Sequence, residues 1–338
     1  MAPKVFSASS RIMTEITTKD CDMVKCIEKE YYLKATGKPI VLVDHHKRIL
    51  NHLFTPVDGE LPYRTMIFSA PKKSAKTEIA AAVTYGYTRI FGGNCYSIAN
   101  DIEQSKSRMF DRVVSALSLM REKNNKLYEK VVHPDFHKAI WKNKEIFFND
   151  NRPKKQLNPG PHWLRYIASD YAGEAGGMPA LTVWDELWAY KSESSFRLWD
   201  EMQPIPNLPA SIRFITTYAG WHGESQLLWG IYEEIVKPDP YNAQEKHGTK
   251  VLGLEDLPCY YKDRYFVYWD HIARMPWHSQ TFLHEAKNDP AVKGRESEFR
   301  RLWQNEWTTG AEAFLDMTVV DARMEEGESL GLVNNMEM

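Results

Sequence analysis

A stretch of ten residues, SAPKKSAKTE at positions 69–78, has the residue types of a phosphate-binding loop. It fits the register of the consensus G-x-x-x-x-G-K-[ST], with two alanines, Ala70 and Ala75, in the places of the two glycines. Lys76 and Thr77 close the motif. In such a loop the lysine reaches the β- and γ-phosphates of a nucleotide, and the final hydroxyl binds Mg²⁺. An alanine where the loop needs a positive φ costs about 1 kcal/mol, which a nucleotide site tolerates.

The surroundings of this stretch favour a nucleotide site over the alternative, a cluster of surface lysines at the start of a helix. The apolar run TMIFS at 65–69 predicts a strand before the loop, and EIAAAV at 78–83 opens a predicted helix after it. The first turn of a helix directs free N–H groups and a partial positive charge toward bound phosphate.

A second stretch, LTVWDE at 181–186, is an apolar strand that ends in two acids. In ATPases of the RecA-like, catalytic-glutamate class, the first acid holds the Mg²⁺ shell and the second polarises the attacking water. These roles would fall to Asp185 and Glu186. The alternative is a strand that runs into an ordinary helix cap, because both acids favour that place. Together with a phosphate loop on another strand, the pair predicts an ATPase.

A third stretch, IRFITT at 212–217, ends in Thr216 and Thr217. In motor ATPases a strand of this kind commonly lies next to the strand that carries the acids, and its hydroxyls sense the γ-phosphate. The alternative is a β-branched strand with good propensity and no catalytic role.

The elements that must position these residues alternate between strands and helices. Such alternation implies a mostly parallel sheet covered by helices on both faces. After about residue 225 helices dominate the pattern, with one strand candidate, which predicts a smaller subdomain packed on the first. The predicted strands are 65–69, 95–99, 145–148, 163–168, 181–184, 212–217 and 264–269, and the predicted helices are 23–35, 45–54, 78–91, 101–122, 225–236, 280–287 and 296–307.

The composition narrows the class of protein. The chain has 338 residues, 43% of them hydrophobic and 12% aromatic, which indicates a folded globular protein and excludes a disordered one. The net charge of −2 means that any contact with a polyanion must come from local basic patches. The four cysteines lack the spacing of a metal site and are expected to be reduced thiols. No apolar run approaches roughly 18 residues, so no membrane span is expected, and the N-terminus lacks a signal-peptide pattern.

The motifs and the blocks around them resemble the ATPase domain of the large terminase subunit of tailed phages, the motor that pumps DNA into procapsids. The match extends from about residue 44 to about residue 314. The loop PKKSAKT at 71–77 is similar to the P-R-K-N-G-K-[ST] form of that family, with a basic residue early in the loop. The blocks that carry the resemblance are DHHKRILNHLF, FSAPKKSAKTEIAA, YIASDYAGEAGGMPALTVWDELWAY, SESSFRLWDEMQPIP, SIRFITTYAGWHGESQLLW, WDHIARMPWHS and EFRRLWQNEW.

The resemblance implies a set of site residues. Lys72 falls on the early basic position, and His46 stands where the family often has a glutamine that contacts adenine. Gln104 matches a recurring family glutamine, or is a solvated helix residue. The implied catalytic residues are Glu186, Lys76 and Lys72; the implied nucleotide-binding residues are Ala70, Pro71, Lys72, Lys73, Ser74, Ala75, Lys76, Thr77, Glu78, His46, Gln104, Thr216 and Thr217; and the implied Mg²⁺ ligands are Thr77 and Asp185.

The fold class implied by the resemblance is α/β. It is a RecA-like P-loop ATPase core of the additional-strand, catalytic-glutamate type, with a mostly parallel sheet and a small helical lid subdomain. We expect an N-terminal helical segment at 1–60, the P-loop core at 61–225, the lid at 226–315 and a linker stub at 316–338. The residues after 314 are too few for the RNase H-like nuclease of full-length large terminases, so we expect no endonuclease activity in this chain.

The function implied by the resemblance is that of an ATP-hydrolysing motor domain that translocates DNA, with ATP and Mg²⁺ as cofactors. The implied partners are double-stranded DNA, the portal protein, the small terminase subunit and further copies of the chain. These copies would form a homo-oligomeric ring on the procapsid in the host cytoplasm, whereas the isolated domain is expected to be a monomer. No membrane is involved.

Basic residues supply the candidates for two further roles. A translocating ring grips DNA phosphates without reading sequence, and such rings use an arginine finger from a neighbouring subunit. Each basic cluster has the alternative of a solvated surface. The candidates for DNA contact are Arg152, Lys154, Lys155, Arg295, Arg300 and Arg301, and the candidates for the finger, among which the sequence does not choose, are Arg152, Arg165 and Arg197.

Two other functions remain open at this point. A helicase-like ATPase would normally show a second RecA-like half or further arginine-bearing motifs, and the chain shows one core. A pseudo-ATPase that binds nucleotide or DNA structurally is suggested by the missing glycines. The retained Lys76, Thr77, Asp185 and Glu186 argue against it.

Overall fold

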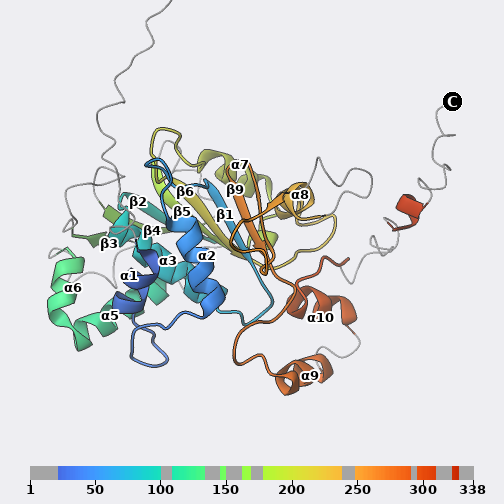
Figure 1. The fold of residues 1–338 in the computed structure, drawn as a ribbon, viewed down its shortest axis with the longest axis horizontal. Helices are drawn as coiled ribbons and strands as arrows, with labels where there is room; N and C mark the ends of the chain where they lie inside the picture. The colour runs from blue at the N-terminus through green and yellow to red at the C-terminus, as the bar shows by residue number, and fades with distance from the viewer. Residues whose placement is uncertain are drawn as a thin grey trace, which may run out of the picture.

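The computed structural model describes residues 22–99, 109–133, 145–149, 162–168, 178–237, 248–290, 295–309 and 322–326. A nine-stranded sheet forms the centre of this part of the chain, with its strands in the order β3-β4-β2-β5-β6-β1-β9-β8-β7 (Figure 1). The six strands from β4 to β9 in this order are parallel, and β3, β8 and β7 join antiparallel at the two edges. The strands are β1 Thr65–Ser69, β2 Asn94–Ala99, β3 Glu145–Phe148, β4 His162–Ala168, β5 Pro179–Asp185, β6 Ile212–Thr217, β7 Thr249–Lys250, β8 Cys259–Lys262 and β9 Tyr265–Trp269.

Helices cover both faces of the sheet (Figure 1). One face packs against α1, α2, α3, α5 and α6, and the other against η5, α7 and α8, which gives two separate apolar cores. A third, small cluster joins α9 and α10 at one end of the molecule. The helices are α1 Met23–Glu30, α2 Asp44–Phe54, α3 Lys76–Ile90, α5 Asp111–Lys123, α6 Asn125–Val131, η5 Leu187–Ala189, α7 Glu193–Glu201, α8 Gln226–Ile235, α9 Gln280–Asn288 and α10 Glu296–Trp303.

Strand β1 shows why the central strands have no polar face. Met66 and Phe68 point into the core on the α3 side, whereas Ile67 points into the core on the α8 side. Successive side chains of a strand alternate between faces, so a strand that is covered on both sides is apolar throughout. All five residues of β1 are buried. The two polar residues of β1, Thr65 and Ser69, stand at its two ends.

Helix α3 is buried along nearly its whole length, and it crosses α1 closely at a glycine. A Cβ on Gly86 would lie 2.4 Å from Met23 Sδ. A side chain at this position would require the Met23 side chain or α1 itself to move, so the glycine permits the close packing of the two helices. This packing fixes the first helix of the described chain against the helix that follows the phosphate loop.

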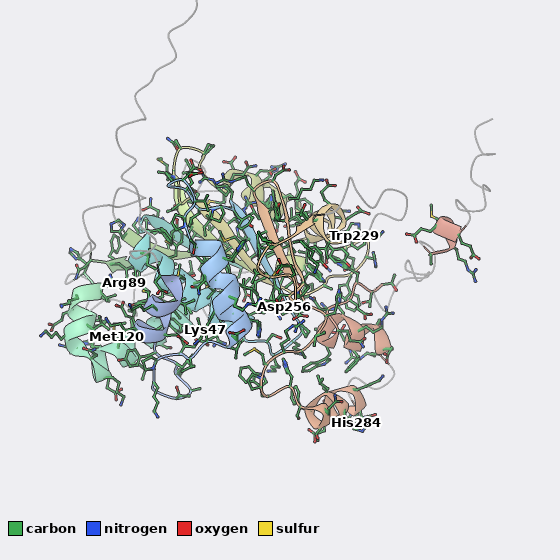
Figure 2. The ribbon with its side chains drawn as sticks, viewed as in Figure 1. Lys47, Arg89, Met120, Trp229, Asp256 and His284 are labelled. Carbon is green, nitrogen blue, oxygen red and sulfur yellow. The ribbon has the colours of Figure 1, made fainter. Side chains whose placement is uncertain are left out.

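Helix α9 differs from the helices on the sheet, because none of its residues is buried. In Figure 2, His284 of α9 lies at the margin of the molecule, far from Lys47 on α2 in front of the sheet. The neighbouring helix α10 buries Phe299, Leu302 and Trp303. The pair α9–α10 is thus attached through α10.

The predicted strands and most predicted helices are present, with bounds within two residues for the strands. The helix predicted at 23–35 ends earlier, at Glu30, and the described part of the helix predicted at 101–122 is α5. Strands β7 and β8 and helices α6 and α7 were not predicted. The predicted helical character of 226–315 is wrong for β7 and β8, which extend the main sheet beyond β1 together with β9, the strand predicted at 264–269.

Candidate nucleotide-binding site

The phosphate loop connects the end of β1 to the first turn of α3. Ala75 precedes α3 in the left-handed conformation, with φ 57° and ψ 20°, and Lys73 also has a positive φ of 67°. The loop therefore has the backbone conformation that glycine usually provides, but it is built here from residues with a Cβ. Each such residue adds roughly 1–2 kcal/mol of local strain.

The side chain of Lys76 lies inside this loop. Its ammonium group donates hydrogen bonds to the carbonyl oxygens of Ala70 at 2.7 Å and Pro71 at 3.0 Å. Burial lowers the pKa of Lys76, and the nearby carboxylates of Glu186 and Asp185 act in the opposite direction. A buried ammonium whose hydrogen-bond acceptors are neutral carbonyl oxygens gains from an anion, so phosphate oxygens can replace these acceptors.

Asp185 lies between two threonine hydroxyls at the carboxyl end of β5. Thr216 Oγ1 donates to Asp185 Oδ1 at 2.8 Å, and Thr77 Oγ1 donates to Asp185 Oδ2 at 3.4 Å. Asp185 is 4% exposed. Strand β6 lies between β5 and β1, so the sheet order itself brings these three side chains together.

The pair of Thr77 and Asp185 fits a Mg²⁺ ion. Mg²⁺ takes octahedral oxygen ligands at about 2.0–2.1 Å, so neighbouring ligands lie about 3 Å apart, and it usually keeps several waters beside one or two protein oxygens. The 3.4 Å between Thr77 Oγ1 and Asp185 Oδ2 is close to this spacing. Among the described residues no cluster of three or more His, Cys, Asp or Glu could hold a metal by itself.

Glu186 follows Asp185 directly and has a left-handed backbone, with φ 58° and ψ 54°. Its N–H donates to the carbonyl oxygen of Thr216 at 2.7 Å, and the indole N–H of Trp188 donates to its Oε2 at 2.7 Å. The strained backbone accompanies a carboxylate that is directed to Trp188 of η5. Strain of this kind is found at catalytic positions, where it is held by the surrounding packing.

The loop is also held from outside by the C-terminal part of the described chain. The N–H of Lys72 donates to the carbonyl oxygen of Leu302 at 2.6 Å, and the indole N–H of Trp277 donates to the carbonyl oxygen of Lys73 at 2.9 Å. Sequence patterns did not identify these contacts. The only available signal was that MPW and RLWQNEW belong to the blocks that carried the family resemblance.

Asn305, which was also missed, links the ends of three neighbouring strands. Its Nδ2 donates to Ser69 Oγ and to the carbonyl oxygen of Asp270, each at 3.0 Å, and its Oδ1 accepts from the N–H of Ala219 at 2.7 Å. Asn305 is fully buried and has a positive φ of 54°. The segment after α10 is thereby fixed to β1, β6 and β9.

His46 lies beneath the loop on α2, with its ring centroid 5.4 Å from that of Phe68. Burial, with a smaller effect of His45, lowers the pKa of His46 to about 3, so the imidazole is neutral. His46 Nε2 and Ser74 Oγ have no hydrogen-bond partner among the described residues, and both residues line a crevice too narrow for a water molecule. A contact between His46 and adenine stays a prediction that requires this crevice to open.

Two other residues predicted to contact the nucleotide, Glu78 and Gln104, are not placed at the loop by the structure. Glu78 accepts hydrogen bonds from Tyr31 Oη at 2.8 Å and from Arg112, so both carboxylate oxygens are engaged by neighbours from the α1 and α5 segments and the side chain has a packing role. Gln104 lies outside the described residues. The structure brings the remaining predicted residues to one place: the loop 70–77, the acids at 185–186 and the threonines at 216–217.

The basic candidates separate into three groups. The prediction of DNA contact for Arg301 is wrong, because this residue is 4% exposed and its guanidinium lies against aromatic rings. Arg300 is paired with Glu306 at 2.7 Å, Arg165 forms an ion pair with Glu145 and stacks on Trp163, and Arg197 is exposed apart from a pair with Glu193 on its own helix. Arg295 is exposed, and Arg152, Lys154 and Lys155 lie outside the described residues.

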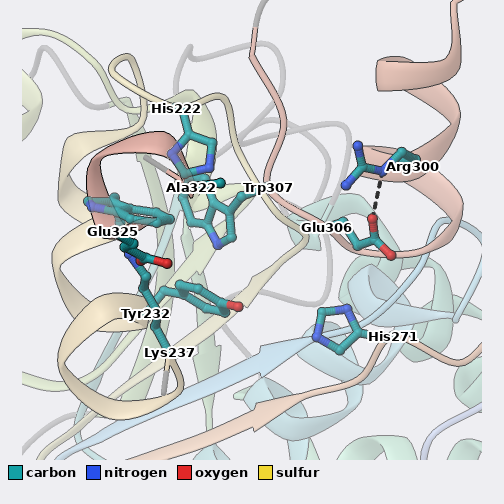
Figure 3. Close-up of a pocket in the computed structure, with 10 residues that line it drawn as sticks. His222, Tyr232, Lys237, His271, Arg300, Glu306, Trp307, Ala322 and Glu325 are labelled. Atoms are coloured by element: carbon teal, nitrogen blue, oxygen red, sulfur yellow. Dashed lines mark hydrogen bonds and ion pairs between the residues drawn. The ribbon is translucent and has the colours of Figure 1, made fainter. Parts of the chain in front are cut away.

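A second concavity, of about 320 Å³, lies beside α8 and the segment after α10 (Figure 3). Its walls are aromatic, and the Arg300–Glu306 ion pair crosses its rim. The lysine and arginine are balanced by acids, so the pocket offers no excess of positive charge to a polyanion. The lining residues are His222, Trp229, Tyr232, Lys237, His271, Arg300, Glu306, Trp307, Ala322 and Glu325.

The fold of the chain is similar to that of solved phage packaging proteins. The large terminase of bacteriophage HK97 superposes with a TM-score of 0.56 at 15% identity, over 90% of this chain and 58% of that one, so the chain spans less than two thirds of its length. The large terminase ATPase domain of Thermus phage P74-26 gives a TM-score of 0.48 at 12% identity, over 80% of this chain and 94% of that one. The Phi-28 gp11 DNA packaging motor gives 0.36 at 13% identity, over 77% and 67%.

No family model matches the sequence, and no curated protein matches it. The likeness to the HK97 protein shows the fold: a mixed α/β chain with a large, mostly parallel sheet of the RecA-like P-loop kind. Among the described residues no helix combines the length and the apolar composition of a membrane span.

Proposed function

We propose that the chain is the ATP-hydrolysing motor domain of a phage DNA-packaging terminase, which couples ATP hydrolysis to translocation of double-stranded DNA into a procapsid. The observation that carries the proposal is the placement of Asp185 between Thr77 and Thr216, beside a loop that encloses Lys76. These residues come from the ends of three strands, and each has the chemistry that a nucleoside triphosphate and Mg²⁺ require.

The residues would divide the work as follows. The N–H groups at the start of α3 and the ammonium of Lys76 bind the β- and γ-phosphates of ATP. Thr77 and Asp185 hold Mg²⁺, which neutralises charge on the phosphate oxygens when it is bound. Glu186 accepts the proton of the attacking water, a contribution of roughly 10²- to 10⁴-fold in rate. Lys72, early in the loop, adds a positive charge near the phosphates.

The coupling to DNA would start at the strand ends. Thr216 donates directly to Asp185, and the next residue, Thr217, precedes the segment that Asn305 holds through Ala219. Loss of the γ-phosphate would therefore displace Asp185 and Thr216, and this displacement would reach β6 and the segment that carries α10. We further propose 1–60 as an N-terminal segment, 61–225 as the core and 226–315 as the lid, with β7, β8 and β9 of the lid extending the core sheet.

The proposal also covers partners and place. Double-stranded DNA, the portal protein, the small terminase subunit and further copies of this chain in a ring are the partners of a packaging motor in the cytoplasm of an infected host. The exposed Arg197 on α7 and Arg165 on β4 stay candidates for a finger between subunits.

The test is a phosphate-release assay on the purified chain with ATP, with and without Mg²⁺. We expect Mg²⁺-dependent hydrolysis that is lost in Lys76→Ala and in Glu186→Gln. Glu186→Gln should keep its affinity for ATP, because the amide preserves the shape and leaves the loop intact, whereas Lys76→Ala should lose affinity. A wild-type protein that binds ATP without hydrolysing it would support the pseudo-ATPase instead, to which the alanine-built loop points.

A further inference from the structure

Arg301 on α10 is a buried cation, and its single ion pair among the described residues does not satisfy all of its hydrogen-bond donors. Its Nη2 donates to Glu298 at 3.1 Å, but Nε and Nη1 have no hydrogen-bond partner among the described residues. The residue is 4% exposed. Leaving a buried donor unpaired costs about 1–3 kcal/mol, so an arginine with two such groups needs a reason to be there.

Three aromatic rings surround this guanidinium. Its Cζ lies 4.3 Å from the ring centroid of Trp221, 4.7 Å from that of Trp188 and 5.1 Å from that of Tyr218. Cation–π contacts of a desolvated arginine contribute up to about 2 kcal/mol each, and they act through the faces of the rings. They hold the orientation of the rings as well as that of the arginine.

Trp188 connects this cage to the proposed catalytic base. Its indole N–H donates to Glu186 Oε2 at 2.7 Å, and its ring faces Arg301. Arg301 therefore holds the ring whose edge holds the carboxylate. The carboxylate belongs to a residue with a strained left-handed backbone, so its position depends on such outside support.

Tyr218 connects the same cage to the phosphate loop. Lys76 Nζ lies 5.0 Å from the centroid of its ring, on which Arg301 also packs. Burial and Glu186 raise the pKa of the Tyr218 hydroxyl, to about 12, while Arg301 lowers it, so the carboxylate and the guanidinium act on one phenol. The next residue along α10, Leu302, accepts a hydrogen bond from the N–H of Lys72.

We propose that Arg301 is a positioning residue for Glu186: from within the same chain it orients Trp188, which holds the Glu186 carboxylate. This inference rests on the proposed function. It assigns to α10 a part in the catalytic site, in addition to its contact with the phosphate loop. Arg301 does not need to touch the nucleotide for this role, so it is distinct from a finger supplied by a neighbouring subunit.

The first test is the split between kcat and KM. Loss of the guanidinium frees the Trp188 ring and with it the Glu186 carboxylate, so Arg301→Met should lower kcat by about tenfold or more. Trp188→Phe, which removes the hydrogen bond but keeps a ring, should lower kcat in the same way. Arg301→Lys keeps a cation beside the rings and should retain more of kcat than Arg301→Met. The KM for ATP should change by less than about threefold in all three, because neither side chain is placed in contact with the nucleotide.

The second test does not depend on hydrolysis. The protein, which has 11 tryptophans, is labelled with 5-fluorotryptophan, and the ¹⁹F resonance of Trp188 is identified by its loss in Trp188→Phe. We expect this resonance to shift in Arg301→Met, in Arg301→Lys and in Glu186→Gln. The matched control is Arg300→Met. Arg300 precedes Arg301 on the same helix, but its side chain is paired with Glu306, so this substitution should leave the Trp188 resonance in place.

The two tests separate the inference from the proposed function. Absence of Mg²⁺-dependent hydrolysis in the wild type would refute the proposed function, and the ¹⁹F spectra would still decide whether Arg301, Trp188 and Glu186 are linked. A Trp188 resonance that stays at its wild-type position in Arg301→Met would overturn the inference. So would a wild-type kcat in both Arg301→Met and Trp188→Phe. If Arg301→Met does not unfold cooperatively, Arg301→Lys carries the ¹⁹F test and Trp188→Phe carries the kinetic test.

Discussion

The hydroxyl of Thr216 donates a hydrogen bond of 2.8 Å to one oxygen of Asp185, and the hydroxyl of Thr77 approaches the other oxygen at 3.4 Å. Thr216 and Asp185 are register partners on β6 and β5, so the sheet itself sets their separation. One buried carboxylate thereby connects the start of α3 to the strand that lies beside β5. If Thr77 and Asp185 bind a metal, the hydrogen bond from Thr216 would remain as the link between Asp185 and β6.

Thr216→Val tests this connection. Valine keeps the shape of threonine and removes the donor, so the buried Asp185 loses a hydrogen bond worth about 1.5–3 kcal/mol to a charged acceptor. We expect the Mg²⁺ concentration that gives half-maximal ATPase activity to rise and kcat to fall at least about tenfold. The control is Thr217→Val, because Thr217 donates to the carbonyl oxygen of Tyr218 instead. Equal effects of the two substitutions would contradict a special role for Thr216.

Ala75→Gly tests the strain in the phosphate loop. Ala75 has φ 57°, and glycine reaches that conformation without the Cβ clash, which removes about 1 kcal/mol of strain. The greater entropy of glycine in the unfolded chain offsets part of this gain. We expect ATP to bind up to roughly tenfold more tightly by calorimetry, with a melting temperature that is unchanged or slightly higher.

A matched substitution separates loop strain from a general effect of glycine. Ala82→Gly lies inside α3 and should lower the free energy of unfolding by about 1 kcal/mol or more. If ATP affinity does not rise in Ala75→Gly, strain in the loop does not limit binding at this site.

His46 predicts a pH dependence of stability. Burial lowers its pKa to about 3, from an ordinary value of 6.5, so between these values the unfolded state binds a proton that the folded state does not. Stability therefore rises with pH across this window and falls on acidification, by about 2 kcal/mol between pH 6.5 and pH 5. His46→Phe removes this dependence.

The measurement is urea unfolding of the wild type and of His46→Phe at pH 8 and pH 5. At pH 8 the imidazole is neutral in both states, so the two proteins differ only through packing. The difference between them should shift in favour of His46→Phe at pH 5. A constant difference at both pH values would show that His46 is not the buried neutral group that the structure places there.

A finger role for Arg197 or Arg165 predicts that the specific ATPase activity depends on protein concentration. If a neighbouring subunit supplies a finger, the isolated chain should hydrolyse ATP slowly, and its specific activity should rise with concentration. Glu186→Gln lacks the base but keeps the finger, whereas Arg197→Ala or Arg165→Ala would lack only the finger. A mixture of Glu186→Gln with the correct arginine variant should be more active than either protein alone. Flat specific activity and no recovery in any mixture would argue against a shared site.

Much of the fold could be predicted from local pattern. Strands β1, β5 and β6 are short apolar runs that end in polar residues, and this pattern is local because each strand is covered on both faces. The edge strand β7 and its neighbour β8 were missed, because both are short and partly exposed and have no continuous apolar signal. Helix α7 was missed because it is short and mostly polar.

The sequence by itself determined the chemical groups of the site: Lys76 and Thr77 after a strand, Asp185 and Glu186 at the end of another, and Thr216 at the end of a third. Their order along the chain and their residue types suffice, since the carboxyl ends of parallel strands meet at one edge of a sheet. The tertiary structure alone decided which side chains support them. Arg301, Asn305 and Trp277 reach the site from segments that carry no phosphate-site pattern, and Trp188, although it follows Glu186 by two residues, was not recognised as its hydrogen-bond donor. Arg301 looked like a surface residue of a basic helix. Its burial depends on contacts with aromatic rings that are distant along the chain, and local periodicity contains no information on such contacts.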